Sequence, residues 1–481
     1  MPSPAPEFEA AVAHRGGAAL VLGVAGSGRT ELIARRYVAL VLEGVPADRI
    51  GVLTQDPATR ARLRDRIETL LDGPYEELRV HTWEELAEKL LRDYALEGGI
   101  DPFFEVVGPA DRLAILLDRI DELPLRRHEI RGNPAGLLAR LLERIDALKE
   151  AGIGPAELRD HARAAERGGG DRGAREAALR ELEFADLFER HDSILLERGA
   201  IDEPELILEL GRLLERRPDI SLAIGDRYRL LMVDELEDAS PSRSALLALL
   251  APHEQVLATC DPDQGLGAFR AWGEGAAERF RAAYPAANEF FLGEAVRGAA
   301  GPAHATAAVA ATAPAPYGSL TRTSIRPSKT SDSGTLAGVV LWRCANERAQ
   351  AQAVAREVEG LLATGAEQPE GICIVTGPAG REGRLIAAAL EERNVPFRSS
   401  GSAAFFHRPE VRDVIAWLRA LADPGDSSAV VRALTRPPVE LRSVDLARCT
   451  TIARRRKLDM ISAVEAALES PQLPPPSRDR L

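Results

Sequence analysis

AALVLGVAGSGRT, residues 18–30, joins a short apolar segment to a glycine-rich turn. Residues 18–22 predict a buried strand, and residues 31–42 have the pattern of a helix. The glycines of the turn would let backbone N–H groups point toward phosphate oxygens, and the N-terminus of the following helix adds the positive end of its dipole. A strand, a glycine-rich turn and a helix in this order predict an α/β layer with a phosphate site.

Residues 23–30 fit the pattern G-x-x-x-x-G-K-[ST] of P-loop NTPases at every position but one, because Arg29 stands in place of the lysine. The predicted ATP-binding residues are Gly23, Val24, Ala25, Gly26, Ser27, Gly28, Arg29 and Thr30. The hydroxyl of Thr30 is a predicted ligand of Mg²⁺. Arginine keeps the charge of lysine, but its planar fork does not fit the same slot. An ordinary strand–turn–helix with a glycine-rich bend is the alternative interpretation of this loop alone.

A second apolar strand ends in acidic residues, in the stretch LLMVDELED at 230–238. P-loop proteins use an acid pair at the end of a buried strand to hold Mg²⁺ and to activate water. This pattern predicts Asp234 as a ligand of Mg²⁺ and Glu235 as the general base. The alternative is a strand that leads into a solvated acidic turn.

Apolar segments and helical periodicity divide the chain into alternating α/β and helical parts. The predicted strands are 18–22, 50–54, 78–80, 228–235, 255–261 and 289–293, followed later by 338–344, 372–377 and 395–400. We expect an ATP-binding lobe whose first part is 1–95 and second part 201–300, an inserted helical subdomain at 96–200, a linker at 301–337, a partial second lobe at 338–405 and a second helical insertion that starts at 406–481.

Composition excludes several classes of protein. Apolar residues make up 45 %, which is too much for a disordered chain, and no apolar run is long enough to span a bilayer. The four cysteines are scattered without a C-x-x-C pair, which argues against a zinc site, an iron–sulfur cluster or a disulfide framework. The first residues lack the features of a secretory signal, so we expect a cytoplasmic protein. The formal net charge of −13 argues against a general nucleic-acid coat, though not against a locally basic groove.

The order of motifs resembles the UvrD/Rep/PcrA superfamily 1 DNA helicases, and more closely their AdnA/RecB-like branch. The similar segments are PEFEAAVAH (6–14), GVAGSGRT (23–30), VLTQDPATRARLRDRI (52–67), VHTWEELAEKLLR (80–92), AIDEPELILELGRLL (200–214), VDELEDASP (233–241), CDPDQGLGAFRA (260–271), LGEAVRG (292–298) and the stretch at 394–421. The resemblance implies a RecA-like parallel sheet with a large helical insertion, followed by a partial second RecA-like lobe with its own helical insertion.

The resemblance also implies a function and a set of site residues. It implies ATP and Mg²⁺ as cofactors and single-stranded or partially duplex DNA as the substrate. Glu235 would be the general base, while Gln264 and Arg297 would sense the γ-phosphate. The implied DNA-contact residues are Thr54, Thr82, Trp83, Phe269 and Arg270.

Several positions depart from the family pattern. Phe8 replaces the glutamine that reads adenine, Val296 replaces a stacking tyrosine, and Glu237 replaces the glutamine of the motif DEFQD. Together with Arg29, these changes lead us to expect weak triphosphate binding with little preference among bases. The family segments H-x-x-K-G-L-E and Y-V-A-x-T-R-A are not found in the sequence, so we expect this chain to lack the arginine that, by the resemblance, would close the ATP cleft from the far side.

Three functions are consistent with these features to different degrees. The leading hypothesis is an ATP-dependent 3′–5′ DNA helicase or translocase of DNA repair or recombination, either truncated or a degenerate motor subunit. The first alternative is a non-catalytic DNA-binding or partner-binding scaffold beside an active helicase or nuclease subunit. The second is a P-loop enzyme of another class such as a kinase, against which the run VDELED…CDPDQ…VRG argues.

Overall fold

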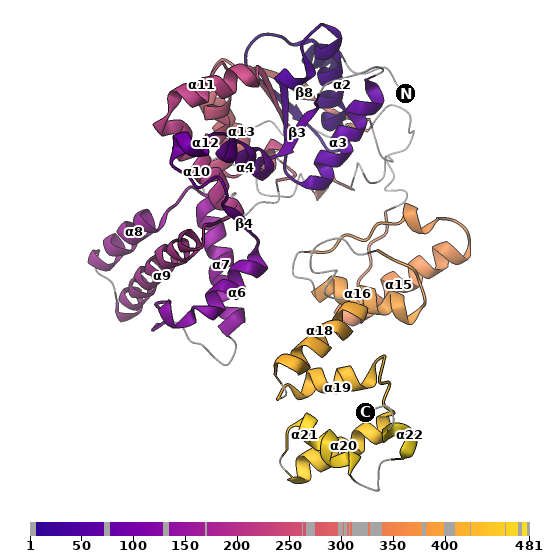
Figure 1. Cartoon of the computed structure of the whole chain (residues 1–481). Coiled ribbons are helices and arrows are strands. Elements are labelled where there is room, and N and C mark those ends of the chain that lie inside the picture. Colours follow the sequence, from indigo (N-terminus) through magenta and orange to yellow (C-terminus); the bar gives the residue numbers. More distant parts are fainter. Residues whose placement is uncertain are drawn as a thin grey trace. The chain divides into compact units, whose positions relative to one another are not determined.

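The computed structural model divides into two compact units, Met1–Val339 and Val340–Leu481 (Figure 1). The structure describes residues 6–71, 77–127, 134–168, 171–261, 263–265, 275–296, 302, 305–306, 308–309, 326–327, 339–377, 381–398, 409–423, 425–456, 458–469 and 474–478.

A six-stranded parallel sheet forms the centre of the first unit, with the strand order β3-β2-β6-β7-β1-β8. Its strands are β1 (Ala19–Gly23), β2 (Ile50–Thr54), β3 (Arg79–Thr82), β6 (Leu230–Val233), β7 (Val256–Cys260) and β8 (Asn288–Leu292). All six strands predicted for this part of the chain are present, with ends that agree to within two residues. The α/β fold with a parallel sheet is therefore confirmed.

Helices cover both faces of this sheet, which explains why its central strands β1, β2, β6 and β7 are apolar runs rather than alternating ones. Along β1, Leu20 and Leu22 belong to one core cluster, whereas Ala19 and Val21 belong to the other. One face packs against α1 (Pro6–Ala13), α2 (Arg29–Leu42) and α3 (Pro57–Leu70). The other face packs against α4 (Trp83–Asp93), α10 (Glu203–Arg216), α11 (Pro218–Arg227), α12 (Pro241–Leu250) and α13 (Ala276–Ala283).

Side-chain caps fix the first residues of two helices that follow strands of the sheet. Asp56 accepts hydrogen bonds from the N–H groups of Ala58 and Thr59 at 2.8 and 2.9 Å, so it caps α3 directly after β2. Thr82 and Glu85 form a capping box at the start of α4. These short strand-to-helix turns place several polar residues at the carboxyl edge of the sheet, where ligands of open α/β sheets bind.

A helical subdomain is inserted between α5 (Ala95–Gly98) and α10. It contains α6 (Pro109–Asp118), α7 (Pro134–Glu150), α8 (Pro155–Arg167), α9 (Arg172–Glu197) and the paired strands β4 (Glu105–Val107) and β5 (Ala200–Asp202). Its core is separate from the two sheet cores and consists mainly of apolar side chains from α7 and α9. The helical pattern expected between the third and fourth strands is therefore present. No helix in the described ranges is long and apolar enough to cross a bilayer.

The second unit contains helices but no strand over its described residues. Helices α15 (Glu347–Ala363) and α16 (Arg381–Glu392) pack together, and a second core joins α18 (Pro409–Ala422), α19 (Ser427–Thr435), α20 (Ser443–Arg456) and α21 (Met460–Leu468), with α22 (Pro475–Arg478) following. The strands predicted at 338–344, 372–377 and 395–400 are wrong for their described residues. A strand needs a hydrogen-bonded neighbour, and these apolar runs have none among the described residues.

Short elements complete the described chain. They are the 3₁₀ turns η1 (Ala47–Arg49), η2 (Ile120–Glu122), η3 (Leu236–Asp238) and η5 (Pro369–Gly371) and the two-residue parallel pair β9 (Glu294–Ala295) and β10 (Arg326–Pro327).

Candidate nucleotide-binding site

The glycine-rich loop lies between β1 and α2, as the sequence predicts. Gly26 and Gly28 have φ values of 77° and 92°, which side chains with a Cβ rarely adopt. A Cβ on Gly23 would lie only 2.6 Å from Ser27 Oγ, so the loop also needs a small residue there. Helix α2 begins at Arg29 with Gly28 as its N-cap, and no side chain of the described residues caps it. The loop therefore has the strand–turn–helix geometry of an anion site.

Asp234 follows β6 and is completely buried. Its Oδ1 accepts a hydrogen bond from the hydroxyl of Thr259 at 2.7 Å, whereas its Oδ2 has no hydrogen-bond partner among the described residues. Burial raises the pKa of this carboxyl, and the hydroxyl groups of Thr259 and Thr30 oppose the increase. The Asp234 Oδ2 atom, which has no partner among the described residues, and the nearby hydroxyl of Thr30 fit the two oxygen ligands expected for Mg²⁺.

Glu235 has a left-handed backbone, with φ 56° and ψ 48°. Two side chains hold this conformation: Gln55 Nε2 donates to the Glu235 carbonyl at 3.0 Å, and the Glu235 N–H donates to Thr259 Oγ1 at 3.3 Å. Burial and the neighbouring charge of Asp234 raise the pKa of the Glu235 carboxyl, against the influence of Arg29. A raised pKa suits a general base, and strained backbone conformations occur often at functional sites.

Arg29 points toward carboxylates rather than into open space. Its Nη1 donates to Glu237 Oε1 at 2.8 Å, and its Nη2 lies 3.9 Å from Asp261 Oδ2. The side chains of Arg29 and Glu237 are only 11 % and 4 % exposed. The cation of the glycine-rich loop is therefore already engaged in a buried ion pair, which does not fit the role of a phosphate-binding lysine.

The acids around Arg29 form a strongly buried group. Burial raises the pKa of Glu237 to about 7, although Arg29 and two backbone N–H groups oppose the increase. Burial likewise raises the pKa of Asp261, again against the charge of Arg29. The Asp261 N–H donates to Glu237 Oε2 at 3.1 Å, which links the two acids.

Phe8 and Val296 flank the loop from the positions where the family has an adenine-reading glutamine and a stacking tyrosine. A Cβ built on Gly28 would lie 3.7 Å from Phe8 Cε2 and 3.7 Å from Val296 Cγ2. Phe8 is buried, and the Val296 N–H donates to the Gly26 carbonyl at 2.9 Å. The side chains of these two residues offer no hydrogen-bonding group to a base.

Of the predicted γ-phosphate sensors, only Gln264 is described. Its Nε2 donates to Asp261 Oδ2 at 2.6 Å, and the residue is exposed. Arg297, Phe269 and Arg270 lie outside the described residues. The structure thus brings together the loop of residues 23–30, Asp234, Glu235 and Gln264 at one edge of the sheet.

The described DNA-contact candidates are buried. Thr54 is fully buried, and Thr82 uses its hydroxyl to cap α4. Trp83 packs in a sheet core, where its Nε1 has no hydrogen-bond partner in the described part of the chain. These side chains therefore serve packing and helix capping. Their contact with DNA stays a prediction, and their burial argues against it.

A cavity of about 480 Å³ lies beside these residues and is lined by six acids and two arginines. The acids are Glu84, Glu85, Glu88, Asp146, Glu150 and Glu203, and the arginines are Arg112 and Arg243. Both arginines are already paired, Arg112 with Asp146 at 2.7 Å and Arg243 with Glu84 at 2.5 Å. The surface next to the expected DNA-contact segments is therefore unfavourable for phosphates.

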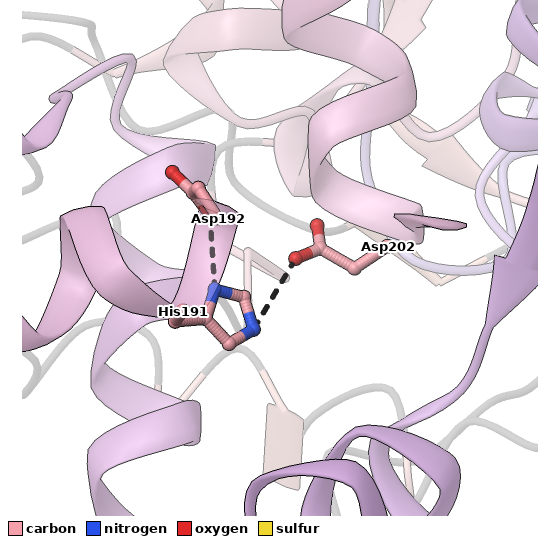
Figure 2. A group of neighbouring side chains, drawn as sticks. All are labelled: His191, Asp192 and Asp202. Atoms are coloured by element: carbon pink, nitrogen blue, oxygen red, sulfur yellow. Dashed lines mark hydrogen bonds and ion pairs between the residues drawn. The ribbon is translucent and has the colours of Figure 1, made fainter. Parts of the chain in front are cut away.

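His191, Asp192 and Asp202 also meet, and their ligand atoms lie within 4.8 Å of one another (Figure 2). The ammonium group of Lys149 occupies the centre of this cluster, at 2.8 Å from both Asp192 Oδ1 and Asp202 Oδ2 and at 2.9 Å from Glu205 Oε2. A metal ion would have to displace this buried cation. We therefore assign the cluster to a structural ion-pair network that joins α7, α9 and the start of α10.

Sequence reasoning missed three residues that shape the site. Thr259 orients Asp234 and Glu235, Asp261 completes the carboxylate group around Arg29, and Arg243 binds Gln55 Oε1 at 3.0 Å. Thr259 and Asp261 end the strand VLATCD, so the rule that polar residues gather at the carboxyl edge of parallel strands could have identified both. Nothing in the sequence marks Arg243.

Comparison with known proteins gives two family matches. Residues 5–280 match the UvrD/REP helicase N-terminal domain, and residues 317–465 match the UvrD-like helicase C-terminal domain. ATP-dependent DNA helicase UvrD1 of Mycobacterium tuberculosis is 27 % identical over 446 residues, which cover 90 % of this chain and 54 % of the relative. DNA helicase II of Escherichia coli is 24 % identical over 458 residues, covering 94 % of this chain and 59 % of the relative. The chain thus spans little more than half the length of these relatives.

Proposed function

Because the chain belongs to the UvrD/REP helicase family, we propose that it is a member of the ATP-dependent 3′–5′ DNA helicases of repair or recombination whose own motor is weakened. The observation that carries this proposal is the contrast within one site. The unpartnered Asp234 Oδ2 suits a metal ion, whereas Arg29 is held by Glu237. In this proposal the site retains the residues that would bind Mg²⁺, but its glycine-rich loop lacks a free cation for the phosphates.

The residues around a bound nucleotide would have distinct tasks. Thr30 and Asp234 would hold Mg²⁺, which supplies electrostatic stabilisation of the phosphates. The Glu235 carboxylate would accept the proton of the attacking water, and Gln264 would contact the γ-phosphate. Phe8 and Val296 would contact the base without hydrogen bonds, so we expect GTP to bind about as well as ATP.

A second candidate function is a scaffold subunit in a cytoplasmic complex with an active helicase or nuclease. The acidic cavity beside Thr82 and the pairing of its two arginines favour this alternative.

We further propose the division expected from the sequence: an ATP-binding lobe at 1–95 and 201–300, helices at 96–200, a linker at 301–337 and two further parts from 338 and 406.

Steady-state ATP hydrolysis with single-stranded DNA tests the weakened motor. We expect turnover indistinguishable from that of Glu235→Gln, because Arg29 is held by Glu237 and is not free to donate to the phosphates. Loss of a single transition-state donor typically costs about 10²–10³ in rate. The inactive Glu235→Gln variant serves as the control for contaminating hydrolase. Turnover on the order of 1 s⁻¹ that Glu235→Gln abolishes would refute a weakened motor.

A direct affinity measurement separates the two candidate functions. We expect Mg²⁺–ATP and Mg²⁺–GTP to bind the parent weakly and with similar affinities. A scaffold that has lost nucleotide binding would show no heat with either nucleotide in a calorimetric titration. Strong binding with a clear preference for ATP would contradict both the weakened site and the loss of base selection.

A further inference from the structure

The Arg29–Glu237 pair joins two substituted family positions that are 208 residues apart in the chain. The family has lysine at the first position and glutamine at the second, so a free cation beside a neutral amide has become a cation bound to a carboxylate. The pair is nearly enclosed by protein, where a charge-assisted hydrogen bond is stronger than in water.

The surroundings of the pair make its release unfavourable. Arg29 acts electrostatically on four acids: Asp234, Glu235, Glu237 and Asp261. Burial raises the pKa of each of these acids, because each loses its hydration. If Arg29 turned toward a bound phosphate, Glu237 would be left buried and without its partner.

We propose that Glu237 determines the affinity of this site by acting as an internal anion that occupies Arg29, so that a polyphosphate must displace it in order to bind. The proposal rests on the proposed function, because it concerns nucleotide binding at the same loop. It assigns to Glu237 a positioning role on Arg29, and no contact with the reacting atoms.

The weaker partner of Arg29 does not replace Glu237 in this role. Asp261 Oδ2 lies 3.9 Å from Arg29 Nη2 and already accepts a short hydrogen bond from Gln264. Glu237→Gln keeps the shape of the side chain, and its amide oxygen can still accept from the Asp261 N–H. The substitution therefore removes the charge that holds Arg29 and little else.

Calorimetric titration with Mg²⁺–ATP and with Mg²⁺–tripolyphosphate tests the proposal on the whole chain. The variants are Glu237→Gln, the double variant Arg29→Ala/Glu237→Gln, and Glu215→Gln as a matched control that removes one exposed carboxylate from α10. We expect Glu237→Gln to bind both ligands at least tenfold more tightly than the parent. The control should bind like the parent, and the double variant should lose the gain because the gain acts through Arg29.

Each other outcome is decisive. If Glu237→Gln and the parent bind equally, the inference is wrong while nucleotide binding at the loop stands. A gain that survives in the double variant would also overturn it, because Arg29 would then play no part. If none of these proteins binds either ligand, the proposed nucleotide site fails and the inference fails with it. Thermal unfolding verifies that the variants fold, and Glu237→Ser replaces Glu237→Gln if the latter does not.

Discussion

At the scale of single residues, the site shows how two substitutions can act as one. Arg29 alone would be a modest change, since it keeps a positive charge in the loop. Glu237 alone would bring a carboxylate toward the phosphates. Together they form a buried pair at 2.8 Å. Each residue type was visible in the sequence, but their contact depends on how β1 and β6 are placed in the sheet, which no local pattern specifies.

Replacing Arg29 by lysine should therefore do little for nucleotide binding. The lysine ammonium would find the same Glu237 and Asp261 carboxylates, and the hydrogen bonds to the base would still be missing. We expect the affinity of Arg29→Lys for Mg²⁺–ATP to stay within tenfold of the parent, which is about 1.4 kcal/mol. A larger gain in a calorimetric titration would show that the shape of the guanidinium, and not its partner, limits the site.

The titration of Glu237 gives a second prediction at this scale. Burial raises its pKa to about 7 from 4.5, so between these values the folded protein binds more protons than the unfolded chain. Stability from this group is therefore lost as pH rises through that window. Compared with Glu237→Gln, we expect the free energy of unfolding of the parent to fall by up to about 3 kcal/mol between about pH 4 and pH 8.

Urea unfolding of both proteins across this range provides the measurement. The difference between parent and Glu237→Gln cancels the other titrating acids, provided that they respond alike. A difference that is constant with pH, or that favours the parent at high pH, would show that Arg29 neutralises the burial cost of Glu237 completely.

At the scale of elements, the sequence predicts the first unit better than the second. The four central strands, β1, β2, β6 and β7, are short apolar runs buried on both faces, and a glycine, an acid or a capping residue lies at or just after the end of each. These signals are local and agree with one another. In the second unit the runs at 340–344 and 372–377 are also mostly apolar, yet they form no strand, because strand formation also depends on a neighbour.

The ion-pair network of Lys149 makes a prediction about how the inserted helices are held. Lys149 is 1 % exposed and contacts three carboxylates, so Lys149→Met would leave the fully buried Asp202 without its closest partner. We expect a loss of about 3–5 kcal/mol in the free energy of unfolding, since one member of a buried pair is removed. Chemical denaturation followed by tryptophan fluorescence measures this loss.

Lys89→Met is the matched control, because Lys89 is one-third exposed and lies 3.9 Å from Glu77. Its loss should not exceed about 1 kcal/mol, as for exposed ion pairs in general. Equal effects of the two substitutions would mean that the Lys149 network contributes no more than a surface pair.

At the scale of the whole molecule, charge limits the DNA that this chain can bind. Its formal net charge is −13, and the cavity beside the expected DNA-contact segments is acidic. We expect a dissociation constant for single-stranded DNA no tighter than about 10⁻⁶ M at physiological salt, in the range of non-specific binding. Fluorescence anisotropy with a labelled oligonucleotide measures it.

A pair of double variants tests whether the cavity itself causes the weak binding. Glu150→Gln/Glu203→Gln removes two carboxylates that have no ion-pair partner among the described residues. Glu157→Gln/Glu166→Gln removes two from α8 in the inserted subdomain. We expect only the first to strengthen DNA binding, by several-fold. Nanomolar affinity of the parent, or equal effects of the two variants, would contradict this expectation.

The reactivity of the four cysteine thiols would show which segments of the chain are covered. Cys344 and Cys373 are exposed and lie within the unpaired apolar runs, whereas Cys260 and Cys449 are buried in cores. A thiol reagent should thus modify two groups rapidly and two only upon unfolding, which mass spectrometry can assign. If a binding partner supplies a strand to either run, labelling of its cysteine should slow while the buried pair stays unchanged. Four thiols reacting at one rate would mean that the division into covered and uncovered segments is wrong.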